Sequence, residues 1–134
     1  MRTEGRQARS PRLATARREL AAAAALKVVL NSLQDSKAED LVSIDLSGKT
    51  PLADFMVVAT GRSSRHVAAA AERLVEDLKK EGVSDIRVEG QKTADWVLVD
   101  AGDIVIHVFR PEVRAFYNLE KMWQADHPAA PVAV

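Results

Sequence analysis

The segment from Ala59 to His66 contains residue types that could bind an anion. Its two adjacent serines could cap a helix, and Arg62 and Arg65 lie beside them. Backbone N–H groups at a helix start, flanked by guanidinium groups, can hold a phosphate. The segment lacks the GxxxxGKS/T and GxGxxG patterns that wrap nucleotides. A capped helix with two solvated arginines is therefore the simpler interpretation, and a nucleotide-binding enzyme is kept as an alternative.

The histidines and aspartates do not form a recognisable catalytic or metal-binding pattern. The sequence has no cysteine and no HxH or HExxH spacing. Four aspartates near predicted strand ends could suggest Mg²⁺, but none belongs to a DxD pair. His107 lies within the predicted strand Ile104–Phe109 and shares a face with Val105, which indicates partial burial, in the core or at an interface. We expect no catalytic residue, no metal site and no cofactor, and therefore a protein that is not an enzyme.

Trp96 and the turn that follows its strand are the best candidates for a binding surface. The turn consists of Asp100, Ala101, Gly102 and Asp103. A tryptophan buries about 150–250 Å² and is a favoured interface anchor. Two carboxylates beside it would orient a basic protein surface and speed its approach. The alternative, that Trp96 belongs to the core and the aspartates only form the turn, fits the spacing equally well.

These residues need a scaffold, and the apolar spacing predicts one. Strands are expected at Val42–Leu46, Phe55–Ala59, Ile86–Glu89, Asp95–Val99 and Ile104–Phe109, and helices from Glu19, from Ser63 to Gly82, and from Pro111 to Trp123. The strand–helix–strand connection from Phe55 to Ile86 predicts a parallel pair, and the other connections predict hairpins. The expected fold is an α/β domain with a mixed five-stranded sheet and flanking helices.

Charge divides the chain into two unequal parts. Residues 1–18 hold six arginines and one glutamate, a balance of +5, whereas residues 19–134 hold 13 basic and 18 acidic side chains, a balance of −5. We expect residues 1–18 to be a disordered arm, residues 19–125 a single α/β domain, and residues 126–134 a flexible tail. The arm could contact RNA phosphates, act as an organelle transit segment, or have no role.

Composition also bears on location. No apolar run approaches the ~20 residues needed to cross a bilayer. We therefore expect no membrane association. The absence of cysteine is in keeping with a reducing compartment, and we expect a cytoplasmic protein.

Three stretches resemble the Iojap-related ribosomal silencing factors. They are DLVSIDLSGKTPLADFMVVATGRSSRHV, EGQKTADWVLVDAGDIVIHVF and RAFYNLEKMW. The resemblance runs from about Leu26 to Trp123 in matching order and spacing. It includes the uncommon strings ATGxSSxHV, ADW, GDxxxHxF and FYxLExxW, which are weak singly and specific together.

The resemblance implies a fold related to nucleotidyltransferases without their catalytic residues. It implies binding to the large ribosomal subunit at ribosomal protein uL14, which blocks joining of the small subunit and represses translation under starvation. A mitochondrial branch assists large-subunit assembly, which is the alternative role. An arm that touches rRNA and a homodimer of the free protein are further possibilities.

Carried over by position, the resemblance implies a docking surface on Trp96 and the turn Asp100, Ala101, Gly102, Asp103. Arg114 and Tyr117 match the family's C-terminal helix, where contact and packing both remain open. The family commonly has a larger residue at position 101, so Ala101 offers less apolar area.

Overall fold

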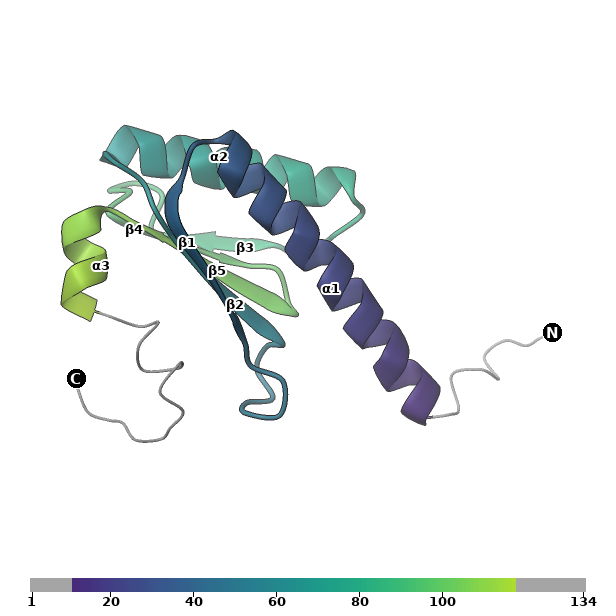
Figure 1. The fold of residues 1–134 in the computed structure, drawn as a ribbon. Coiled ribbons are helices and arrows are strands. Elements are labelled where there is room, and N and C mark those ends of the chain that lie inside the picture. The colour runs from purple at the N-terminus through teal and green to yellow at the C-terminus, as the bar shows by residue number, and fades with distance from the viewer. Residues whose placement is uncertain (1–10, 118–134) are drawn as a thin grey trace.

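The five strands form one sheet, and two long helices lie against one of its faces (Figure 1). The structure is a computed structural model, and it describes residues 11–117. The helices are α1 (Pro11–Asp35), α2 (Ser64–Lys80) and α3 (Pro111–Tyr117), and the strands are β1 (Glu39–Asp45), β2 (Phe55–Thr60), β3 (Arg87–Glu89), β4 (Trp96–Asp100) and β5 (Ile104–Phe109). The predicted mixed five-stranded sheet with flanking helices is confirmed.

The strand order is β1-β2-β5-β4-β3. Strands β2 and β5 run parallel in the middle, with Val58 opposite His107, and the other neighbours are antiparallel. The predicted parallel pairing of the strand at Phe55 with the strand at Ile86 was wrong. Strand β5 suits the central position because five of its six side chains are apolar, and nearly all of them are buried there, whereas β3 has only three residues and lies at the edge.

Helix α1 begins at Pro11, so the predicted start near Glu19 was wrong. Proline suits the first helical position because its fixed φ is helical and its missing N–H would have no helical partner. The alanines, arginines and leucines that follow are good helix formers. Apolar periodicity identified only the part of the helix that packs on the sheet. Residues 11–18 of the expected arm are therefore helical, and residues 1–10 and 118–134 lie outside the described part.

Two apolar clusters lie on opposite faces of the sheet. The larger one joins α1 and α2 to the sheet through residues such as Leu33, Leu74, Val97 and Ile106. The smaller one occupies the other face and consists of Ile44, Leu46, Ala53, Met56, Val58 and Phe109, with Val42, Trp96, Val105 and Val113 packed against it. Within residues 11–117, α3 is the helix that lies against this second face, through Val113. We call this the open face of the sheet.

Candidate docking surface

Trp96 begins β4 on the open face. Strand alternation places Val97 and Val99 in the cluster beneath the helices, and it turns Trp96, Leu98 and Asp100 to the opposite side. All three of these side chains are partly buried. The face that Trp96 shares with Leu98 is therefore the face that α1 and α2 leave uncovered.

The Trp96 ring rests on the aromatic side chain of its cross-strand partner. Trp96 lies directly opposite Phe109 in the β4–β5 register. Their ring centroids are 4.9 Å apart with an interplanar angle of 19°, and Phe109 is fully buried. Such stacking adds about 0.5–1.5 kcal/mol beyond the area it buries. The ring therefore packs on the core while part of it stays exposed, and its role as an interface anchor stays a prediction.

His107 is buried beside these two rings. Its side chain is only 8% exposed, and its ring centroid lies 5.8 Å from that of Trp96 and 5.7 Å from that of Phe109. The indole Nε1–H of Trp96 donates a hydrogen bond to Nδ1 of His107 at 2.9 Å. Burial lowers the pKa of His107 from 6.5 to about 4, so the ring is neutral near pH 7. Because Nδ1 accepts, the proton of the neutral ring lies on Nε2.

The turn after β4 is held by hydrogen bonds of its own residues and by bonds to a neighbouring connection. Gly102 has a φ of 88°, which suits glycine, and its N–H donates to the Asp100 carboxylate at 2.9 Å. Ala101 is partly buried and Asp103 is exposed. The Asp103 carbonyl oxygen accepts the N–H groups of Asp54 at 2.8 Å and Phe55 at 3.1 Å. These bonds join the turn to the connection between β1 and β2.

Leu52 lies in that connection and was missed by the sequence analysis. It is 83% exposed, which is unusual for a large apolar side chain, and its neighbour Ala53 is buried in the open-face cluster. Its N–H donates to the Thr50 hydroxyl at 3.1 Å, which helps to shape the turn. A leucine directly after the turn-forming run that ends at Pro51 was the available signal. Its exposure, however, depends on the fold of the turn.

Arg114 makes internal contacts that tie α3 to the sheet. One guanidinium nitrogen, Nη1, donates to the Asp40 carbonyl oxygen at 2.6 Å and to the Thr60 hydroxyl at 2.7 Å. Asp40 has a φ of 51° at an irregularity in β1, and its carbonyl group is thereby available to this side chain. The geometry favours packing over partner contact for Arg114. Tyr117 ends α3, and its side chain lies outside the described part.

The candidate anion site at the start of α2 is occupied by the protein's own groups. Ser63 is the N-cap, and its hydroxyl accepts the N–H of His66 at 3.1 Å. His66 Nδ1 also accepts the N–H of Arg62 at 3.0 Å, and its Nε2 lies 2.7 Å from the Ser36 carbonyl oxygen. The Arg62 side chain pairs with Glu39 at 2.8 Å. The helix start is therefore satisfied by capping, as in the simpler interpretation.

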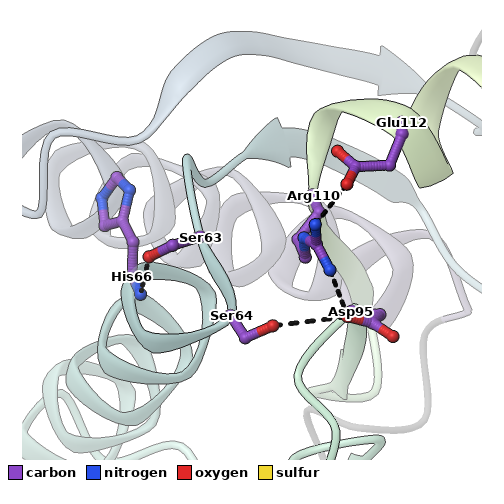
Figure 2. Close-up of polar contacts among 6 residues, drawn as sticks. All are labelled: Ser63, Ser64, His66, Asp95, Arg110 and Glu112. Carbon is purple, nitrogen blue, oxygen red and sulfur yellow. Dashed lines mark hydrogen bonds and ion pairs between the residues drawn. The ribbon is translucent and has the colours of Figure 1, made fainter.

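A carboxylate also faces this helix start. Asp95 accepts hydrogen bonds from the Ser64 hydroxyl at 3.3 Å and from the Arg110 guanidinium at 3.0 Å. Arg110 also pairs with Glu112 (Figure 2). A phosphate placed here would be repelled by Asp95, so the arrangement does not support nucleotide binding. Among residues 11–117, no three acidic or histidine side chains are grouped to hold a metal ion. In that same range, no helix is both long and apolar enough to span a membrane.

Known proteins resemble this chain over most of its length. The pattern of the family described as "Ribosomal silencing factor during starvation" matches residues 19–133. The chain is 50% identical over 109 residues to the ribosomal silencing factor RsfS of Zymomonas mobilis, which covers 78% of this chain and 82% of that protein. It is 33% identical over 101 residues to a Mus musculus protein named "Mitochondrial assembly of ribosomal large subunit protein 1", covering 73% of this chain and 44% of the mouse protein. A crystal structure of a Chromobacterium violaceum protein, 42% identical, matches with a TM-score of 0.73 and covers 81% of this chain and 91% of that one.

Proposed function

The chain belongs to the ribosomal silencing factor family, and from this premise we propose that it binds the large ribosomal subunit and prevents the small subunit from joining. The contact is made with ribosomal protein uL14, and translation is repressed under starvation. The contact surface consists of Trp96, Leu98, Leu52 and the turn from Asp100 to Asp103. We refer to these residues as the docking surface.

One observation carries this assignment: an aromatic anchor and the carboxylate of Asp100, the residue that begins the acidic turn, lie on the same open face of the sheet. Trp96 and Leu98 are partly exposed there, Asp100 ends the same strand, and the exposed Asp103 follows directly before β5. The four steps between the first and the last of the five residues of β4, at about 3.3 Å each, place its two ends roughly 13 Å apart. With Leu52 beside the turn, this length fits one side of an interface that buries about 800 Å² per partner.

The side chains have different tasks in this surface. Trp96 supplies most of the affinity because the partner can cover the exposed part of a ring whose orientation is already fixed, with little further loss of side-chain entropy. The carboxylates supply orientation and a faster encounter with a basic protein, and their effect weakens with salt. Leu52 provides exposed apolar area in the connection that is hydrogen-bonded to Asp103.

Silencing of this kind needs no chemical step. The subunit-joining surface of a ribosome is large and must be approached closely over its whole extent. A folded domain seated on it excludes the other subunit by volume alone. The relevant quantities are therefore the affinity and the lifetime of the complex, and neither depends on turnover.

A subunit-joining assay tests the proposal. The protein is incubated with purified large subunits, small subunits are added, and the mixture is separated on a sucrose gradient. We expect the protein to migrate with large subunits and the joined ribosome peak to decrease as protein is added. Migration with small subunits only, or an unchanged joined peak at saturating protein, would contradict it.

The name of the mouse relative supports a second role, in assembly of the large subunit. A deletion strain separates the two roles. Accumulation of immature large subunits during growth indicates assembly, whereas excess translation limited to starvation indicates silencing.

Three further expectations stay predictions. They are contact of residues 1–18 with rRNA, self-association of the free protein, and a cytoplasmic location. The division into arm, domain and tail is likewise a prediction beyond the helix start already described.

A further inference from the structure

The hydrogen-bond donor of Trp96 is directed into the protein. Its Nε1–H meets Nδ1 of His107 at 2.9 Å, and His107 is itself buried in the sheet. We propose that His107 is a positioning residue for docking, because by accepting this N–H it fixes the indole orientation that the large subunit meets. The inference rests on the proposed function, and it names a residue that acts through Trp96.

Stacking alone would not fix the orientation of the ring. The torsion between Cβ and an aromatic ring has broad wells of roughly two-fold character. An indole turned over about that torsion could still stack on Phe109, but its N–H would point elsewhere. His107 distinguishes the two orientations because it lies on the neighbouring strand, diagonal to Trp96 and opposite Leu98. Diagonal neighbours on one sheet face are within reach of aromatic side chains.

The state of the imidazole suits this task. Nδ1 can accept a hydrogen bond only while it carries no proton. Burial keeps the pKa of His107 low, at about 4, so the acceptor is available near neutral pH. Leucine or phenylalanine at position 107 would fill the site but would provide no acceptor for the indole.

Two variants separate positioning from stability. His107→Leu removes the acceptor and keeps an apolar side chain in a buried site. His107→Asn places an amide oxygen close to the position of Nδ1, but it buries a polar group in a smaller volume. Stability should therefore rank leucine above asparagine, because the apolar side chain suits the core better. If His107 positions Trp96, His107→Asn should dock more tightly than His107→Leu.

Three measurements are made on the full-length protein. Urea unfolding gives stability, and co-pelleting with isolated large subunits gives the dissociation constant. The third is the Nε1–H resonance of Trp96 in a ¹H–¹⁵N spectrum, identified by its loss in Trp96→Phe because the chain has two tryptophans. A hydrogen-bonded indole proton resonates downfield and exchanges slowly with water.

We expect His107→Leu to move this resonance upfield and to weaken docking roughly 3- to 10-fold, the range that corresponds to one net hydrogen bond. We expect His107→Asn to restore both readouts, with docking within about 2-fold of the original protein, despite its lower stability. The inference is overturned if His107→Leu docks more tightly than His107→Asn, as their stabilities would suggest. It is also overturned if His107→Leu docks as tightly as the original protein.

Trp96→Ala distinguishes failure of this inference from failure of the proposed function. If Trp96→Ala weakens docking and His107→Leu does not, only the positioning role is overturned. If Trp96→Ala docks as strongly as the original protein, the docking surface is wrong and the positioning role is overturned with it.

Discussion

Gly90 lies against the carbonyl oxygen of Trp96 so closely that a β-carbon at position 90 would overlap it. Gly90 also has a φ of 88°, which side chains rarely allow, and its own carbonyl oxygen accepts the N–H of Ala94 at 2.9 Å. The residue directly follows β3 and closes the loop that leads into β4. Its lack of a side chain therefore helps to set the backbone position from which the Trp96 ring extends.

Replacing Gly90 with alanine should destabilise the protein by about 2–4 kcal/mol. About 1–2 kcal/mol comes from the positive φ, and the overlap with a backbone atom adds the rest. Urea unfolding measures the loss. Gly82→Ala is the matched control, because Gly82 has a φ of 89° with no atom within 4 Å of the added carbon. If both variants lose the same free energy of unfolding, the overlap of the added β-carbon with the Trp96 carbonyl oxygen does not contribute to the loss.

The buried imidazole of His107 predicts a pH dependence of stability. Burial lowers its pKa from 6.5 to about 4, so between these values the unfolded chain binds a proton that the folded chain does not. The free energy of unfolding must then increase with pH across this window. The total change is on the order of 3 kcal/mol between roughly pH 7 and pH 4. Unfolding curves at several pH values measure it, and His107→Leu should remove this part of the slope.

Arg114 should matter for stability more than for docking. Its guanidinium group joins α3 to the Asp40 carbonyl and to the buried Thr60 hydroxyl. Removing these charge-assisted bonds in Arg114→Ala should cost about 1.5–3 kcal/mol of stability. Docking of the folded protein should stay within about 2-fold of the original, because the guanidinium group already bonds to the protein's own oxygen atoms. A stable Arg114→Ala variant that no longer pellets with large subunits would place Arg114 in the interface.

The sequence alone predicted those features that depend on local periodicity. Both ends of the strand Ile104–Phe109 were predicted correctly, because an apolar run bounded by a turn and a proline is a strong local signal. The burial of His107 followed from the two-residue repeat of the same strand, which places its side chain on one face with Val105. The two adjacent serines predicted a helix cap, and the structure shows that Ser63 is the capping residue.

The pairing and register of the strands could not be predicted from local periodicity. The parallel partner of β2 depends on which strand becomes central, and this is decided by burial over the whole sheet. The bond between Trp96 and His107 depends on the register of β4 against β5, which no local pattern gives. The exposure of Leu52 likewise depends on how the connection between β1 and β2 folds, and that connection is held by hydrogen bonds to Asp103, far away in the sequence.

Leu52 offers a test of the docking surface that does not disturb the fold. Because it is 83% exposed, Leu52→Ala should change the free energy of unfolding by less than about 0.5 kcal/mol. It should weaken docking roughly 3- to 10-fold, as expected for a secondary apolar contact. Asn31→Ala is the control, since Asn31 is exposed on α1, on the other side of the sheet. If Leu52→Ala and Asn31→Ala dock equally tightly, Leu52 is not part of the docking surface.

The central claim is that Trp96 anchors this protein on the large ribosomal subunit. The most direct measurement compares the dissociation constants of the original protein, Trp96→Ala and Trp96→Phe for isolated large subunits, after circular dichroism has confirmed that each is folded. Trp96→Phe keeps a ring that can stack on Phe109, so it guards against loss of binding through unfolding. The account predicts that Trp96→Ala costs about 2–4 kcal/mol, a weakening of roughly 30- to 1,000-fold, with Trp96→Phe in between. A folded Trp96→Ala variant that binds large subunits as tightly as the original protein would contradict it.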